Sequence, residues 1–400
     1  MEHQVLQFPI RLSVRSLLSG LLCVLCLYVV DLTAQDFKQL HPGVEHAQVE
    51  HKLGSDPVKI NLLRLDLKKV RLDVHHALDK AIGLETTSSI AKRKGAVAAI
   101  NSGFFRLDKS IWAGDAAGLL MIDGKLLSEG ISGRQSLWIS GPMGVPHTRI
   151  MSDQQYVVFS RQVLRWRVRV GTVIKVLSGV NRERKSNELV IYTPEFGQTT
   201  LTDDSGTEVV VKNGRIIDIS PRKGSNKIPR NGYIVSGSGD FIDELLKFRV
   251  GTKVDIGTQF FDPEISTNSS GNIKLPTYDI VGGVPQLIKN GQIDITWEQE
   301  KASKAFAETR HPRTAVAKMK DGKFLMMTAD GRQPGVSVGM SLQELAEYLF
   351  SLGAVDAMNL DGGGSTTMYL DGKVVNTPSD KEGERKVGDA IVVTLRNKKK

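Results

Sequence analysis

The chain has 400 residues, of which 40% are hydrophobic and 24% charged, and this is an ordinary globular composition. The formal net charge of +9 suits contact with anionic polymers or membrane surfaces, and it equally describes a solvated basic surface. No zinc-finger, RNA-binding or helix-turn-helix pattern accompanies this charge, so nucleic acid is not an expected partner.

Residues 1–34 have the features of an export signal. Arg11 and Arg15 precede an apolar run over residues 17–30, and residues 32–34 offer a site for cleavage. The run is short for a membrane span, so a cleaved signal is favoured over an uncleaved anchor. We therefore expect a periplasmic or extracellular protein with no integral membrane domain once the signal is removed, or a membrane-tethered one if it is retained.

Both cysteines of the chain, Cys23 and Cys26, lie inside this apolar run. The exported protein would then contain no cysteine, so neither a disulfide nor thiolate chemistry is expected of it. Its stability must come from the core, which a domain of this size can build.

The first elements after the signal are predicted to be mostly strands. Residues 35–56 are polar and mixed, and we expect a mature leader that packs loosely. Residues 58–67 and 70–78 alternate apolar with polar residues, as strands do. A short helix is predicted over 86–95, followed by a nearly continuous apolar strand in 96–105.

Hairpins are the most frequent feature of the remaining chain. An Asp-Gly or Asn-Gly pair between two apolar arms favours the backbone of a tight hairpin turn. Five segments have this pattern: 118–128, 209–220, 286–296, 315–331 and 367–376. This density of hairpins predicts a β-rich, antiparallel fold.

Two helices are predicted in the second half. Residues 341–353 carry a capping box formed by Ser341 and Glu344, an apolar stripe, and a terminal Gly353. Residues 239–251 form the second candidate. The predicted fold class is therefore α+β, β-rich with antiparallel hairpins and a few packed helices. The main domain is expected over 57–396, with 151–270 as a subdomain or elaborated edge.

The stretch 358–369 (MNLDGGGSTTMY) places one carboxylate, Asp361, before Gly362, Gly363 and Gly364. Three glycines weaken an element unless the turn needs unusual backbone angles or a group must approach the main chain closely. Their backbone N–H groups could face a bound anion. Alternatively, Asp361 accepts bonds only from the amides of its own turn.

Polar residues at the ends of apolar strands extend this candidate site. They are Asn101, Arg310, Arg313, Asp330 and Asp361. A rigid sheet can present strand-end side chains to one cleft, and the planar forks of two arginines suit a phosphate or carboxylate. Each stretch taken alone is an ordinary turn or strand break, so the prediction depends on their convergence.

With these motifs the chain resembles the phosphodiester glycosidase (NAGPA) domain family. The resemblance rests on four stretches, at 99–105, 281–291, 310–354 and 357–368, and extends from about residue 58 to 395. It implies hydrolysis of the bond between an anomeric sugar carbon and a phosphodiester, with a phosphorylated carbohydrate as substrate. The family often has Asn-Gly-Gly-Phe-Phe where this chain has Asn101-Ser102-Gly103, which leaves open how closely a ligand approaches there.

The positions supported by this resemblance are given hypothetical roles. Arg310 and Arg313, with the amides of Gly362, Gly363 and Gly364, would hold the phosphate. Asp361 is the favoured general base or electrostatic stabiliser, and Asp330 is the second candidate. Asn101, Thr314 and Ser365 would orient sugar hydroxyls or water.

Some of these residues could have a purely structural role instead of a role in binding or catalysis. Arg313 could pair with Asp330 instead of touching a ligand, and His311 could serve only as a spacer. A metal site is also open: no zinc pattern is present, whereas Asp330, Asp361 and Asn359 could supply oxygen ligands to calcium, although an Asp-rich loop is lacking.

The function expected from the sequence is an exported hydrolase that acts on sugar-phosphodiester linkages of a surface glycopolymer or conjugate. A non-catalytic module that binds glycans or anionic polymers is one alternative. A phosphodiesterase that breaks the phosphorus–oxygen bond is another.

Overall fold

The structure is a computed structural model that describes residues 35–131, 133–140, 155–161, 163–261 and 278–396. The export signal expected in residues 1–34, with both cysteines, lies outside the described residues. No helix among the described residues is long and apolar enough to cross a membrane.

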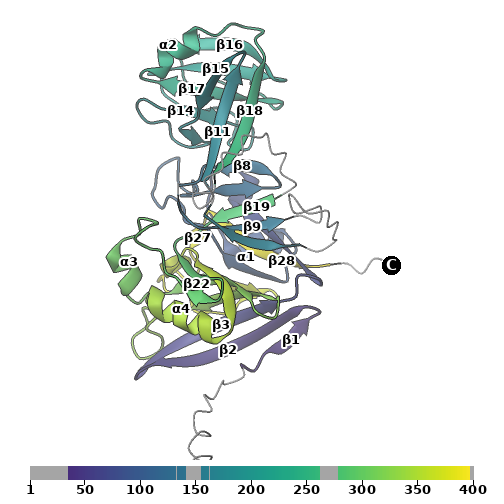
Figure 1. Cartoon of the computed structure of the whole chain (residues 1–400), viewed down its shortest axis with the longest axis vertical. Helices are drawn as coiled ribbons and strands as arrows, with labels where there is room; N and C mark the ends of the chain where they lie inside the picture. The colour runs from purple at the N-terminus through teal and green to yellow at the C-terminus, as the bar shows by residue number, and fades with distance from the viewer. Residues whose placement is uncertain (1–34, 132, 141–154, 162, 262–277, 397–400) are drawn as a thin grey trace, which may run out of the picture. The chain divides into compact units, whose positions relative to one another are not determined.

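The largest sheet has eight strands, and every neighbouring pair in it is antiparallel. Its strands in spatial order are β1 (Lys38–His41), β2 (Val44–Leu53), β3 (Asp56–Leu65), β23 (Phe324–Ala329), β22 (Arg313–Met319), β24 (Ala354–Asn359), β20 (Gln286–Lys289) and β21 (Gln292–Ile293). Helix α4 (Leu342–Ser351) covers one face of this sheet, where its leucines pack against residues such as Leu62 and Met327 (Figure 1).

The opposite face of the large sheet packs on a second, five-stranded sheet. Its strands are β26 (Lys373–Val374), β25 (Met368–Leu370), β6 (Ala98–Asn101), β28 (Asp389–Leu395) and β4 (Val70–His76). Leu63 and Met326 from the first sheet share one core with Ile100 and Ile391 from the second. Helix α1 (Thr87–Arg93) lies on the outer face of the second sheet, and β5 (Glu85–Thr86) pairs with β27 (Lys386–Val387).

Three further sheets are formed largely by the middle of the chain. The first contains β10 (Val157–Ser160), β9 (Ser136–Ser140), β19 (Tyr278–Gly282), β7 (Leu120–Ile122) and β8 (Lys125–Ser128). The second contains β12 (Val173–Val176), β11 (Val163–Val170) and β18 (Val254–Phe261). The third contains β13 (Gly179–Val180), β14 (Leu189–Tyr192), β17 (Gly232–Ser238), β15 (Gly206–Lys212) and β16 (Arg215–Pro221). One apolar core joins them, because Met121, Val168 and Val235 belong to the same buried cluster.

The predicted fold class is confirmed: the chain is β-rich, with antiparallel sheets and a few helices. All five predicted hairpins form, as β7–β8, β15–β16, β20–β21, β22–β23 and β25–β26. In four of them both turn residues have positive φ, for example Asn290 at 50° and Gly291 at 73°, which is the backbone that this turn type requires.

The predicted helices form with shorter bounds. The capping box of Ser341 and Glu344 is present at the start of α4. The helix predicted over 239–251 is α2 (Phe241–Leu246), and α3 (Lys304–Glu308) was not predicted.

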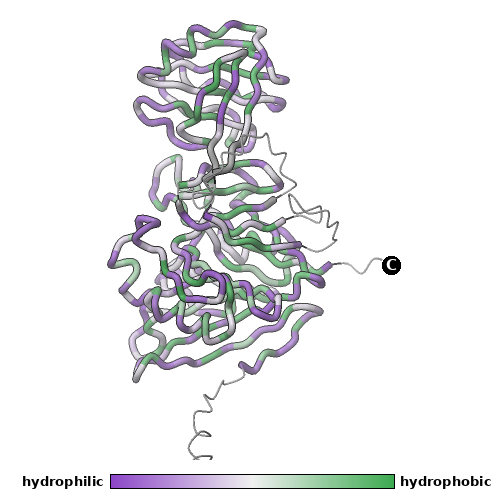
Figure 2. The backbone as a smooth tube through the Cα atoms, in the orientation of Figure 1, coloured by the Kyte–Doolittle hydropathy of each residue, from purple (hydrophilic) through white to green (hydrophobic). Residues whose placement is uncertain are grey.

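Residues 35–56 were expected to be a loosely packed leader, and this expectation of loose packing is wrong. This segment forms β1 and β2, and β2 pairs with β3 along its whole length. Polar residues outnumber apolar ones along β2, as Figure 2 shows. Gln48, Glu50 and Lys52 are exposed on one face of the strand, whereas Ala47 on the other face is buried.

Candidate functional site

The glycine-rich loop begins where β24 ends, and Asp361 is its first residue. The Asp361 amide donates to the Ser102 carbonyl at 2.9 Å, which ties the loop to the end of β6. The Gly362 amide donates to Asp361 Oδ1 at 2.9 Å, and the Gly363 amide donates to the Pro312 carbonyl at 2.9 Å. Two of the three glycine amides expected to face an anion are therefore used within the fold. The Gly364 amide has no partner among the described residues.

Close contacts explain why this loop needs glycine. Gly363 has φ of 60°, which residues with a side chain rarely adopt. A Cβ on Gly362 would lie 2.6 Å from the Pro312 carbonyl oxygen. A Cβ on Gly364 would lie 2.2 Å from both Arg385 Nη2 and Asp380 Oδ1. The glycines therefore allow protein groups to approach the main chain.

The Asp361 carboxyl has a strongly perturbed acidity. Burial raises its pKa to about 6, and the nearby Asp389 carboxyl acts in the same direction. The Ser365 hydroxyl, the Gly362 amide and the Arg385 guanidinium oppose the rise. A carboxylate with this pKa can exchange a proton near neutral pH, which is the property required of a general base.

Asn101, one of the predicted strand-end residues, contacts the loop at Asp361, and Thr314 contacts Asn101. Asn101 Nδ2 donates to the Asp361 carbonyl at 2.7 Å, and Asn101 Oδ1 accepts from Thr314 Oγ1 at 2.8 Å and from the Thr367 amide at 3.0 Å. Both Asn101 and Thr314 are completely buried. Their polar atoms join β6 and β22 to the segment between β24 and β25, so these atoms are already bonded within the protein.

The two arginines assigned to the phosphate are engaged elsewhere. Arg310 forms ion pairs with Glu344 at 2.6 Å and Asp56 at 2.8 Å. Arg313 is 1% exposed, and its guanidinium donates to the backbone carbonyls of Met340, Phe306 and Thr309. Burial lowers the Arg313 pKa to about 10. Neither guanidinium can bind a phosphate without breaking these contacts.

Asp330 is likewise enclosed. Its Oδ1 accepts from Asn376 Nδ2 at 3.0 Å, its Oδ2 accepts from the Thr377 amide at 3.0 Å, and it is 2% exposed. Burial raises its pKa, while these hydrogen bonds act against the rise. Asp330 thus holds the loop after β26 in place. It makes no pair with Arg313 in the part of the chain that the structure describes.

Arg332 lies within the stretch 310–354 and was not among the predicted site residues. It is exposed and forms no ion pair with a described residue. Its Nη2 lies 2.9 Å from the position of a Cβ on Gly363 and 3.5 Å from His311 Nδ1. Burial and the charges of Arg313 and Arg332 lower the His311 pKa. Arg332 therefore supplies an uncompensated positive charge at the glycine loop.

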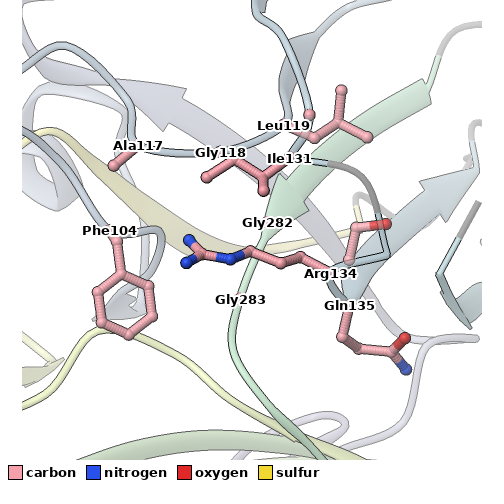
Figure 3. Close-up of a pocket in the computed structure, with 11 residues that line it drawn as sticks. Phe104, Ala117, Gly118, Leu119, Ile131, Arg134, Gln135, Gly282 and Gly283 are labelled. Atoms are coloured by element: carbon pink, nitrogen blue, oxygen red, sulfur yellow. The ribbon is translucent and has the colours of Figure 1, made fainter. Parts of the chain in front are cut away.

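A small cavity adjoins this loop on the side of the Asn101-Ser102-Gly103 turn. It encloses about 20 Å³, enough for about one water molecule, between Phe104, Gly118 and Gly283. Figure 3 shows the Arg134 side chain extending across it toward Phe104. Arg134 Nε donates to the Glu300 carbonyl at 3.2 Å, and its terminal nitrogens have no partner among the described residues. No motif in the sequence singled out Arg134.

Gly283, which lines the cavity, packs against the end of β24, where a Cβ on it would lie 2.5 Å from the Asn359 carbonyl oxygen. The Gly283 amide donates to the Gln135 carbonyl at 2.9 Å, and Asn359 Nδ2 donates to the Val284 carbonyl at 2.8 Å. Phe104 contacts Phe306 edge-on, with ring centroids 6.1 Å apart. The turns before Phe104 and around Gly283 therefore meet the end of β24 beside Asp361.

Buried polar atoms without a hydrogen-bond partner gather around this junction. They are Asn359 Oδ1, Ser365 Oγ, Thr366 Oγ1, Thr367 Oγ1, Asp389 Oδ2, and both amide atoms of Gln135. Buried polar groups are almost always paired in folded proteins, so such a group of orphans points to a bound polar ligand or to water. Of the predicted hydroxyls, that of Ser365 belongs to this group and lies beside the Asp361 carboxyl.

Ser102 is held by a buried carboxylate below the site. Its hydroxyl donates to Asp389 Oδ1, and the Gly103 amide donates to the same oxygen at 2.6 Å. Burial raises the Asp389 pKa, and the buried His76 beside it acts against the rise. The Ser102 hydroxyl therefore points toward the buried Asp389 carboxylate.

The calcium site expected from Asp330, Asp361 and Asn359 finds no support in the geometry. Both oxygens of Asp330 already accept protein hydrogen bonds. No group of three or more His, Cys, Asp or Glu side chains is placed to hold a metal ion within the described residues.

Comparison with known proteins places these features in context. Residues 205–394 match the phosphodiester glycosidase family. N-acetylglucosamine-1-phosphodiester alpha-N-acetylglucosaminidase of Mus musculus is 30% identical over 181 residues, which are 43% of this chain and 33% of the relative. The Homo sapiens protein of the same name is 36% identical over 115 residues, or 26% of this chain and 22% of the relative. The chain therefore spans a third or less of the length of these curated relatives.

Two crystal structures share the fold. A hypothetical protein from Synechocystis superposes with a TM-score of 0.72 at 24% identity, covering 88% of this chain and 62% of that one. A Burkholderia pseudomallei protein described as exported superposes with a TM-score of 0.71 at 24% identity, covering 85% of this chain and 74% of that one. These two likenesses concern the fold alone.

Proposed function

Because the chain belongs to the phosphodiester glycosidase family, we propose that it is an exported hydrolase that cleaves the glycosidic bond of a sugar-1-phosphodiester. We place the substrate in a surface glycopolymer or glycoconjugate, and we propose residues 151–270 as a subdomain of the enzyme. The observation that carries the proposal is the Asp361 carboxyl, whose pKa is raised to about 6 beside a group of unpartnered polar atoms. The N-terminal signal pattern supports export.

The chemistry that such a bond requires is limited. A phosphodiester leaves as a stabilised anion, so little protonation of the leaving group is needed. In the proposed step, Asp361 takes a proton from water while the water oxygen bonds to the anomeric carbon. The bond between that carbon and the phosphate oxygen breaks, and its electron pair leaves with the phosphate. The products are a free sugar and a phosphate monoester.

The roles that we assign to the side chains around Asp361 differ from those expected from the sequence. We assign the phosphate charge to Arg332, and Arg134 in the cavity lined by Gly283 is a second candidate cation. Ser365 would contact the sugar or the attacking water. Asn101, Thr314, Asp330, Arg310 and Arg313 become positioning residues, since their polar atoms are bonded within the protein.

Ionisation of Asp361 predicts a pH dependence of turnover. The base must be deprotonated, so kcat/KM should rise with pH, by about tenfold per pH unit at the acid end. It should level off above the Asp361 pKa of about 6. Initial rates with a soluble sugar-1-phosphodiester across this range would measure the profile. A flat profile from roughly pH 4 to pH 8 would remove Asp361 as the titrating base.

Arg332 and Arg310 provide a matched pair of substitutions. We expect Arg332→Gln to lower kcat/KM by about 100-fold, because a charge-assisted contact to the phosphate is lost. Arg310→Gln should leave kcat/KM within about threefold and lower only stability, because its ion pairs are internal. Steady-state kinetics on the folded variants would decide. The reverse pattern would return the phosphate role to Arg310.

A panel of synthetic sugar-1-phosphodiesters tests the proposed function itself. The panel should vary the sugar and the alcohol on the phosphate, with a reducing-sugar assay and a phosphate-monoester assay run together. The proposal expects equal release of both products for at least one sugar. Saturable binding across the panel without product would instead favour the non-catalytic glycan-binding alternative.

A further inference from the structure

The sheet formed by β12, β11 and β18 carries a hollow on its outer face, separate from the residues of the proposed active site. This hollow has a volume of about 340 Å³. Arg167 and Arg169 from β11, Ile174 from β12, and Lys253, Asp255 and Gly257 from β18 line it. Its size falls in the range of ligand-binding clefts.

Strand register explains the hollow. Arg167 lies opposite Gly257 on one side and Val176 on the other, and Arg169 lies opposite Asp255 and Ile174. Because Gly257 has no side chain, the sheet surface is open beside Arg167. Val168, which lies between Arg167 and Arg169 in the sequence, points to the other face and is buried in the core.

The arginines of this hollow have no internal counterion. Neither Arg167 nor Arg169 makes a hydrogen bond or an ion pair with any residue that the structure describes. Asp255, the carboxylate nearest in register, contacts Lys253 at 3.4 Å. Arg167 is half-buried, and a half-buried guanidinium without an acceptor favours a bound anion.

The surrounding chain adds to this positive charge. Residues 163–261 contain 16 Lys and Arg against 11 Asp and Glu, so this quarter of the chain carries more than half of its net charge of +9. Ile174 and Val176 are 46% and 51% exposed beside the arginines. Charge and exposed aliphatic surface together suit a ligand in which phosphates alternate with carbon-rich units.

We propose that this hollow, the β11 groove, binds a segment of a phosphodiester-linked polymer. Alternate residues on a strand lie about 7 Å apart, so Arg167 and Arg169 engage successive phosphates of a chain better than one isolated phosphate. The identity of the polymer as the substrate of this protein rests on the function proposed above. Binding in the groove would raise the local concentration of scissile linkages for the active site.

The test measures binding of a synthetic poly(glycerol phosphate) to the full-length protein. The variant Arg167→Gln/Arg169→Gln removes both guanidinium groups, and Arg222→Gln/Arg230→Gln is the control, because it removes the same charge from exposed positions of the same region. The proposal expects Kd to rise about tenfold in the groove variant and by less than about twofold in the control. Equal weakening in both variants, or none in either, would overturn it.

Two further probes separate the sources of phosphate. Inorganic phosphate should bind at least about tenfold more weakly than the polymer, because it can meet only one arginine. Vesicles that contain phosphatidylglycerol should bind the groove variant and wild type alike. Loss of vesicle binding without loss of polymer binding in the groove variant would overturn the proposal in favour of a membrane surface.

Turnover of a small soluble sugar-1-phosphodiester distinguishes this inference from the proposed function. The groove variant should retain kcat and KM for that substrate, because Arg167 and Arg169 do not belong to the active site. If wild type hydrolyses the small substrate but polymer binding is insensitive to the groove variant, only the groove inference fails. If polymer binding depends on the groove but no substrate is hydrolysed, only the proposed function fails.

Discussion

Replacing Asp361 with Asn is expected to lower kcat for a sugar-1-phosphodiester by about 100- to 10,000-fold while the protein stays folded. The amide keeps the shape of the side chain and can still accept from the Gly362 amide, but it cannot take a proton from water. Single-turnover release of the free sugar would measure the loss. Asp321→Asn, in the exposed turn of the β22–β23 hairpin, is the matched control and should retain wild-type turnover.

The same substitution should increase stability at neutral pH. The Asp361 pKa is raised in the folded protein, so ionising this group opposes folding. Its unfavourable contribution is absent below about pH 4, grows as the pH rises toward 6, and is then constant at roughly 1–3 kcal/mol. Asp361→Asn should therefore raise the free energy of unfolding at pH 8 and not at pH 4. Lower stability at pH 8 together with unchanged turnover would mark Asp361 as a purely structural turn residue.

Replacing Arg313 with Leu is expected to lower the free energy of unfolding by about 3–5 kcal/mol. The guanidinium satisfies three backbone carbonyls, and its plane lies over the Phe306 ring with 4.9 Å from Cζ to the ring centroid. Leucine would leave those carbonyls buried without donors. Urea unfolding followed by circular dichroism would measure the change.

The partly exposed Arg310 is the control for this prediction. Arg310→Gln removes two ion pairs at the surface and should cost only about 1 kcal/mol. An Arg313→Leu protein that keeps wild-type stability but loses affinity for the phosphodiester would contradict the structural role. It would restore the interpretation that Arg313 binds phosphate.

The secondary structure was most predictable where local chemistry decides it. An Asn-Gly or Asp-Gly pair favours a tight hairpin turn, and all five hairpins form around such a pair, four of them with both turn residues at positive φ. The capping box of Ser341 and Glu344 fixes the start of α4 in the same local way. The strand β2 was missed because its solvent-facing residues give it a polar composition, and the two residues of its turn to β3, Gly54 and Ser55, are not an Asn-Gly or Asp-Gly pair.

The candidate site was predictable in its location and less so in its roles. Of the five strand-end residues, Asn101 contacts the loop at Asp361, whereas Arg310, Arg313 and Asp330 bond to other parts of the protein. Which groups an arginine contacts depends on the fold around it. Arg310 pairs with Glu344, and Arg313 donates to backbone carbonyls. Arg134 had no motif to mark it, since its place in the cavity follows from how its segment packs against Glu300.

The glycines after Asp361 illustrate the same division. The sequence required either unusual backbone angles or a close approach to the main chain, and both occur: Gly363 has positive φ, and Gly364 admits the Arg385–Asp380 pair. The groups that approach these glycines are protein groups, namely the Pro312 carbonyl at Gly362 and the Arg385–Asp380 pair at Gly364. They come from distant parts of the chain, so the sequence around the glycines does not identify them. Arg332, next to Gly363, is the cation at this loop to which we assign the phosphate.

Hydrolysis in isotopically labelled water tests the central claim most directly. The substrate should be the sugar-1-phosphodiester turned over fastest, and the heavy oxygen should be located in each product by mass spectrometry. Attack at the anomeric carbon predicts that the label enters the hydroxyl on that carbon and that the phosphate monoester stays unlabelled. Label in the phosphate would show cleavage of the phosphorus–oxygen bond and would contradict the proposed glycosidase.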